Sequence, residues 1–330
     1  MKNFKYFLFL IVLFSLLSFT YCTGDDGDLS NDVATILDAD SDGVSDDKDS
    51  CDDTPSGATV DLDGCAASQK DTDGDGVNDD LDICDDTAIG TTVDANGCQI
   101  FLYLDENGIT VKAMEGAVVG EVYLLNDISY VVVDAEMLAQ MIKLDEDVTK
   151  VVTTQITDMS VLFGEASSFN EDIRSWDVSN VTNMADMFWK ATSFNQDISP
   201  WDVSNVNDME GMFSLTDAFN QDISSWDISN VSKMGYLFWR ATSFNQDISS
   251  WDVSNVTKMD YMFWEASSFN QDISSWDVIS VTNMQEMFYE ATSFNQDLSG
   301  WKVGNVVYCW NFSRDTPAWI LPKPNFTNCN

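Results

Sequence analysis

Histidine is absent from the 330-residue sequence, and only 15 lysines and arginines stand against 56 aspartates and glutamates. Without histidine, the chain cannot use Ser-His-Asp or Cys-His catalysis or a metal site with imidazole ligands. The net charge of −41 excludes nucleic-acid binding through neutralised phosphates, and it excludes docking on anionic lipid through basic residues. Because 44% of the residues are hydrophobic, part of the chain can still bury a core, and the length predicts two or three domains.

Charge is also missing from residues 6–21, an apolar run that follows Lys2 and Lys5. The run is shorter than the ~20 residues of a membrane-spanning helix, so residues 1–22 are predicted to be a secretory signal. Cys22 follows directly, and an acidic cluster comes next. This order resembles the signal of surface-exported bacterial lipoproteins, although residues 19–21 are bulkier than usual. The resemblance implies acylation of Cys22 and a lipid anchor at the cell surface or outer membrane; plain secretion is the alternative.

Two copies of an acidic pattern lie between residues 38 and 98, and their landmarks repeat at a spacing of 33 residues. Closely spaced carboxylates repel one another unless cations neutralise them. Oxygen ligands at alternate positions before a glycine suit Ca²⁺. The predicted Ca²⁺ ligands are Asp38, Asp40, Asp42, Val44, Asp46 and Asp49 in the first copy and Asp71, Asp73, Asp75, Val77, Asp79 and Asp82 in the second, each valine through its carbonyl.

These offsets match an EF-hand loop, but no amphipathic helix flanks either copy and a cysteine follows two residues later, which argues against an EF-hand. The order of Asp, Gly and Cys resembles the thrombospondin type-3 repeat. The resemblance implies a loop-rich acidic stalk over 23–99 that winds around Ca²⁺; a disordered acidic linker is the alternative. The four cysteines of the copies, Cys51, Cys65, Cys84 and Cys98, allow three pairings. Pairing within each copy is favoured, but the sequence does not settle it.

Residues 100–150 change character and predict a small β-rich cap. Strand-like runs flank Asn107-Gly108 and Asn126-Asp127, which are typical hairpin turns. Residues 135–144 predict a short helix. A stack of repeats needs such a cap because its first repeat would otherwise expose a hydrophobic face.

Tryptophan recurs every 25 residues from Trp176 to Trp301. Within one repeat, the spacing Ile173-x-x-Trp176-x-Val178 predicts a strand, and apolar residues between Val181 and Phe188 have helical spacing. A strand and a short helix cannot bury a core alone, but stacked copies can. The predicted fold is therefore an α/β leucine-rich-repeat-like solenoid over 151–308, followed by a C-terminal cap over 309–330 that a disulfide between Cys309 and Cys329 would hold.

The FNQDISSWDVSNVTNMxxMF pattern resembles the repeats of BspA-type bacterial surface proteins, which implies adhesion to or binding of an extracellular protein or glycan. In-register stacking predicts a hydrogen-bonded column of asparagines that starts at Asn170, and it aligns the aspartates that follow each tryptophan. Those aspartates are satisfied either by serine and backbone N–H groups or by cations, and we favour the first. An aromatic row is the candidate recognition stripe, although packing between repeats would also explain it: Trp189, Trp239, Trp264 and Tyr289.

These features favour a non-catalytic, calcium-binding adhesion or binding protein on the cell surface, attached to the membrane only through a lipid. A passive spacer or coat protein is the second hypothesis. A carboxylate-based glycosidase is the third and weakest, because catalysis needs carboxylates in distinct environments, whereas the acids here recur in equivalent settings.

Overall fold

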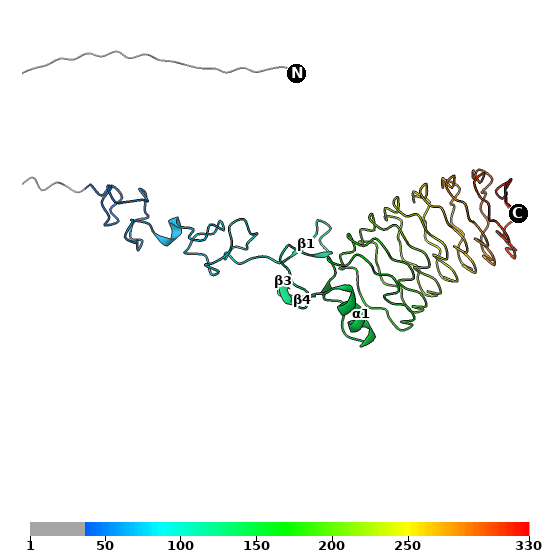
Figure 1. The fold of residues 1–330 in the computed structure, drawn as a ribbon, viewed down its shortest axis with the longest axis horizontal. Coiled ribbons are helices and arrows are strands. Elements are labelled where there is room, and N and C mark those ends of the chain that lie inside the picture. Colours follow the sequence, from blue (N-terminus) through cyan, green and yellow to red (C-terminus); the bar gives the residue numbers. More distant parts are fainter. Residues whose placement is uncertain (1–36, 330) are drawn as a thin grey trace, which may run out of the picture.

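The computed structural model describes residues 37–329, so the predicted signal and the acylation site at Cys22 lie outside the described residues. An extended acidic segment, a small β-rich cap and a long stack of chain turns follow one another along the molecule (Figure 1). Between residues 37 and 329, no helix is both long enough and apolar enough to cross a membrane.

The acidic segment contains one short 3₁₀ helix, η1 (Ala67–Gln69), between its two copies. Disulfides join Cys51 to Cys65 and Cys84 to Cys98, so the favoured pairing within each copy is confirmed. Disulfides persist in oxidising compartments, and their presence indicates an exported protein.

The cap contains two antiparallel hairpins. Strand β1 (Leu102–Leu104) pairs with β2 (Val111–Ala113), and β3 (Val122–Leu125) pairs with β4 (Ile128–Val132). Strand β5 (Val151–Val152) then pairs with β4 in parallel. The predicted hairpins are confirmed.

Local sequence explains the turns of the cap. Asn126 and Asp127 both have positive φ, at 51° and 64°, as a two-residue hairpin turn requires. Helix α1 (Ala135–Lys143) begins after Asp134, whose side chain accepts a 2.8 Å hydrogen bond from the Met137 N–H. Its Leu138 is fully buried, so α1 covers the end of the stack as the cap prediction expects.

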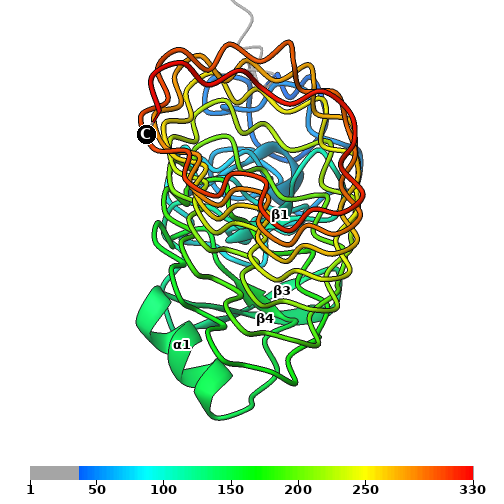
Figure 2. The same cartoon turned by 90° about the vertical axis from the view of Figure 1, so that its right-hand side faces the viewer.

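The stack is built from coils, each of which is one 25-residue turn of the chain. We name each coil after its tryptophan, so that the Trp176 coil is 168–192, and we call residues 25 positions apart a column. Parallel bridges link one column from Asp158 through Asn183 to Tyr308, always at a spacing of 25 residues. Seen along the stack, successive coils overlie one another (Figure 2). The prediction of a repeat protein is confirmed.

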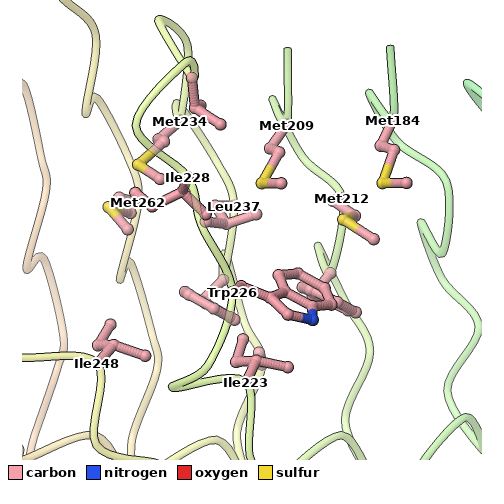
Figure 3. Close-up of a cluster of buried hydrophobic side chains, with 14 of the residues drawn as sticks. Met184, Met209, Met212, Ile223, Trp226, Ile228, Met234, Leu237, Ile248 and Met262 are labelled. Atoms are coloured by element: carbon pink, nitrogen blue, oxygen red, sulfur yellow. The ribbon is translucent and has the colours of Figure 1, made fainter. Parts of the chain in front are cut away.

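The core of the stack consists of columns of identical side chains. Trp176 and Trp201 lie 6.4 Å apart with nearly parallel rings, and the Trp201 Nε1 donates a 3.1 Å hydrogen bond to the Ile173 carbonyl of the previous coil. Methionines and isoleucines pack around each indole (Figure 3). Met184 and Phe188 are fully buried, and each such side chain contributes about 1.5–3 kcal/mol relative to exposure. No coil can bury these residues without its neighbours.

The predicted secondary structure of the repeat is wrong. Within the described coils, no strand covers Ile173–Val178 and no helix covers Val181–Phe188. The second segment is a string of overlapping turns in which Asp186 and Lys190 have positive φ, at 55° and 59°. Apolar residues three and four positions apart reach one side of such a string as they do in a helix, so the apolar spacing does not separate the two conformations.

In this segment, the N–H groups of alternate residues donate hydrogen bonds to carbonyls of the next coil, and we call these bonds the ladder. In the Trp176 coil they are Met184 N to Asp208 O, Asp186 N to Glu210 O, Phe188 N to Met212 O and Lys190 N to Ser214 O, at 2.8–2.9 Å. The same four bonds recur at all six interfaces between described coils, always donated toward the following coil. The backbone, rather than a tryptophan–valine strand, therefore joins the coils at this segment.

The predicted asparagine column is confirmed. The Asn170 Oδ1 accepts a 2.9 Å hydrogen bond from the Asn195 N–H, and its carbonyl accepts one from Gln196 Nε2. Equivalent bonds continue along the column to Asn295. The aspartates after each tryptophan accept from the N–H two residues ahead, as Asp202 does from Ser204 at 3.1 Å, in agreement with the favoured alternative.

An aromatic cap covers the core at the far end of the stack. Trp319 packs edge-on against Phe288 and Phe294. The predicted disulfide between Cys309 and Cys329 is present, and it fixes this tail to the Trp301 coil.

Candidate functional site

Two groups of carboxylates in the acidic segment could hold a cation. In each group, three side chains place oxygens within 4.8 Å of one another: Asp38, Asp40 and Asp42, and Asp71, Asp73 and Asp75. The loops fold this way because the carboxylates accept N–H groups within the same loop, as Asp71 Oδ2 does from Gly76 at 2.9 Å. These six residues are half of the predicted ligand set.

The other predicted ligands lie in the same two loops but outside these groups. Asp46 Oδ1 accepts a 2.8 Å hydrogen bond from the Ala39 N–H. The Thr72 hydroxyl and N–H donate to Asp79, and the hydroxyl is the main cause of the lowered pKa of that carboxyl. Val44 and Val77 donate their N–H groups to Asp42 and Asp75.

The last predicted ligand of each copy faces a glycine. A Cβ atom at Gly64 would overlap the Asp49 carboxylate and would lie 3.2 Å from Asp42 Oδ2. Gly97 has the same relation to Asp82 and Asp75. Each loop thus brings one further carboxylate near a member of its group, over a backbone position that has no room for a side chain.

The donor set fits a hard divalent cation. Three oxygens of the loops are buried and accept no hydrogen bond, namely Asp38 Oδ1, Asp42 Oδ2 and Asp75 Oδ2. Buried carboxylate oxygens without partners are costly, and carboxylates are the ligands that Ca²⁺ prefers. The acidic clusters could therefore bind a metal ion.

Two threonines that sequence reasoning missed hold the central carboxylate of each group. The Thr54 N–H donates to Asp40 Oδ2 at 2.7 Å, and the Thr87 N–H donates to Asp73 Oδ2 at 2.6 Å. The Thr54 hydroxyl also donates to the Gly64 carbonyl. The recurrence of Cys-Asp-Asp-Thr in both copies was the signal that could have identified these threonines.

The coils differ from one another at a group of five nearby positions, which are residues 183, 185, 186, 189 and 190 in the Trp176 coil; positions 182 and 192 vary as well. All five lie in or next to the ladder segment, around the buried positions 184, 187 and 188, which hold Met, Met or Leu, and Phe from the Trp176 coil to the Trp276 coil. Most of their side chains are only partly buried. We call these five columns the variable face.

The predicted recognition stripe runs along this face and is half-buried. Ser214 interrupts it between Trp189 and Trp239. The Trp239 and Trp264 rings lie 5.7 Å apart, and Tyr289 meets Trp264 edge-on at 5.3 Å.

Two tyrosines from another variable column extend this row. Tyr236 and Tyr261 stack on each other at 4.5 Å and contact Trp239 and Trp264, respectively. We call the five neighbouring rings the aromatic patch: Tyr236, Trp239, Tyr261, Trp264 and Tyr289. Aromatic residues at two variable positions of the same coil were the sequence signal for the tyrosines.

Charged groups surround the aromatic patch. Burial raises the pKa of Tyr236 to about 12, and Tyr261, Asp260 and Glu210 act in the same direction. Burial also raises the pKa of the Asp260 and Glu210 carboxyls. Arg240 pairs with Glu265 of the next coil at 3.1 Å. Tryptophan, tyrosine and arginine side chains are enriched at binding hot spots.

Comparison with known proteins places the coils in a family. Residues 132–241 and 218–317 match the family described as "Mycoplasma protein of unknown function, DUF285". The chain belongs to this family. The DUF285 matches begin at the end of β4 and extend through the Trp301 coil, so they span the stack and more than half of the chain. No curated protein and no solved structure matches the chain.

Proposed function

We propose that this chain is an exported cell-surface protein that binds an extracellular protein or glycan through the variable face. The observation that carries the proposal is the contrast between uniform core columns and five variable ones. A purely structural stack would have no reason to gather so many variable positions in one segment beside uniform core columns. The BspA-type resemblance supports an adhesion role, and the disulfides support export. The lipid anchor at Cys22 rests on the resemblance of residues 1–22 to a lipoprotein signal.

The acidic segment, in this proposal, is a Ca²⁺-binding stalk of the thrombospondin type-3 kind. Asp38, Asp40 and Asp42 would hold one ion, and the equivalent aspartates of the second copy another. The bound cation supplies charge neutralisation. The chain itself supplies the disulfides and the threonine N–H groups that orient the carboxylates before the ion binds.

Replacement of Trp239 and Trp264 by Ala tests the binding role. The double variant should lose the ligand that the parent chain selects from an array of glycans and matrix proteins, because hot-spot rings supply most of a binding energy. Tyr103→Ala is the control, since Tyr103 is an exposed aromatic residue of the cap and lies outside the variable face. Thermal unfolding checks that both variants fold.

A passive spacer remains the second candidate because the rings are half-buried against one another, as packing alone would leave them. An array on which the parent chain binds nothing, or on which the double variant binds as well as the parent, would favour the spacer.

A further inference from the structure

The ladder ends in an unpaired edge on the Trp301 coil. By the 25-residue repeat, the N–H groups that would donate to a following coil belong to Cys309, Asn311, Ser313 and Asp315. Among residues 37–329, none of these four N–H groups has a hydrogen-bond acceptor. The equivalent groups of every preceding coil are bonded, so this edge is the one unfilled copy of an interface that the described chain makes six times.

The edge differs from that of an ordinary β-strand, which presents N–H and C=O groups in alternation. Here every ladder bond runs in the same sense, so the ladder segment presents donors only toward the far end. Two such edges cannot pair face to face, because donors would meet donors. The complement must offer carbonyl oxygens from alternate residues, as the ladder segment of a following coil does.

Exposed aromatic side chains flank the donor row. Tyr308 is 60% and Trp310 58% exposed. In the preceding coils, the same two columns hold only polar or small residues: Asp158, Asn183, Asp208, Lys233, Lys258 and Asn283, and Ser160, Ala185, Glu210, Gly235, Asp260 and Gln285. Terminal repeats usually present a polar outer face, so large rings here point to a surface that is covered in use.

A pocket adjoins the other end of the row. Ser313 and Asp315 line a pocket of about 620 Å³ together with Lys323 and Thr292. Its volume lies in the range of ligand pockets. The donor row is therefore bordered by apolar rings on one side and by a hollow with a cationic side chain on the other.

We propose that this edge binds a segment of a partner polypeptide in the turn conformation of the ladder, which adds to the edge as a following coil would. The partner's carbonyls accept from the four N–H groups, and an apolar partner side chain covers Tyr308 and Trp310. Strand addition to an open edge is an established mode of peptide recognition. The unusual element is the donor-only edge, which selects a partner segment in the turn conformation of the ladder.

A synthetic peptide of residues 281–292, which fill the equivalent place in the stack, is the probe. Fluorescence anisotropy should detect its binding to the full chain, and a scrambled peptide should not bind. Amide hydrogen exchange should slow at Cys309, Asn311, Ser313 and Asp315 when the peptide is added. Without peptide, these amides should exchange faster than their bonded equivalents in the Trp276 coil.

Variants locate the site. Tyr308→Ala with Trp310→Ala should weaken peptide binding at least tenfold, whereas Ile320→Ala, which truncates an exposed apolar residue outside the row, should leave it unchanged. The Trp239→Ala and Trp264→Ala variant should also bind the peptide normally, which separates this edge from the aromatic patch. Absence of binding at millimolar peptide, equal binding by the double variant, or protection of the four amides by self-association without peptide would overturn the proposal.

Discussion

Side chains that repeat in register determine much of this structure. The asparagine column was predictable because identical residues 25 positions apart must meet in a stack, and an amide can bond to the backbone of its neighbour. Tyr236 and Tyr261 were not predicted, because the sequence reasoning followed one aromatic column and not the column beside it. Positive φ at Asp186 and Lys190 left no sequence signal, since neither residue is glycine.

Asn245→Ala should destabilise the stack. The substitution removes the oxygen that accepts hydrogen bonds from the Asn270 N–H and from Gln271 Nε2. We therefore expect a loss of about 1–3 kcal/mol in the free energy of unfolding. Urea denaturation measures the loss. Asn245→Asp keeps the accepting oxygen and the shape, and it should cost clearly less. Equal losses would show that the column does not act through this oxygen.

Tyr236 should make the stack sensitive to high pH. Its folded pKa of about 12 lies above the ordinary value of 10.0, so the folded state holds the proton more tightly than the unfolded state. The stability that this hydroxyl contributes is complete below pH 10 and is lost as the pH rises toward 12. Thermal unfolding between pH 9 and pH 12 should show a smaller loss for Tyr236→Phe than for the parent, and parallel losses would contradict the assignment.

At the scale of elements, the spacing of the apolar residues predicted that the sequence repeats, but it did not predict the secondary structure of one repeat correctly. Met184, Met187 and Phe188 reach the core from overlapping turns as they would from a helix. The ladder distinguishes the turns from a helix, because alternate N–H groups donate to the next coil instead of to a carbonyl of the same coil. Whether they can do so depends on the neighbouring coil. The cap was predictable in more detail, since its turns at Asn107-Gly108 and Asn126-Asp127 are local.

Deletion of one complete coil, residues 243–267, should leave a folded protein. Each coil contacts only its neighbours, and the new interface would repeat the same ladder bonds and tryptophan stacking. Cooperative urea unfolding with a smaller m-value, in proportion to the lost buried surface, is the expected result. Deletion of residues 243–254 alone breaks the register and should unfold the stack. A whole-coil deletion that behaves like the partial one would contradict a modular stack.

At the scale of the whole molecule, the order of acidic segment, cap and stack followed from the sequence because each part has its own repeat or composition. The pairing within each acidic copy was favoured by symmetry but not settled by the sequence, and the disulfide between Cys309 and Cys329 was expected because it would hold the C-terminal tail. The unpaired donor edge was not, because the sense of the ladder bonds is a property of the assembled stack and of no single residue.

Ca²⁺ should change the acidic segment more than the coils. Calorimetric titration of the full chain should show binding at roughly 10⁻⁴ to 10⁻³ M, the range of extracellular modules, with a decrease in hydrodynamic radius as the carboxylates are neutralised. Asp40→Asn with Asp73→Asn should abolish most of the heat. Asp247→Asn with Asp272→Asn, which removes the same charge from the coils, should not. A Ca²⁺ titration that produces no heat change would contradict the calcium assignment.

The stacking of one coil on the next also determines how the molecule would respond to mechanical tension. A load applied between the stalk and the far end runs along the stack, across one coil interface after another. The weakest interface opens first, and each released coil adds about 85 Å of slack, because extended chain spans roughly 3.4 Å per residue. A molecule built in this way would lengthen in equal steps under tension, and it would absorb a sudden pull while the remaining coils stay folded.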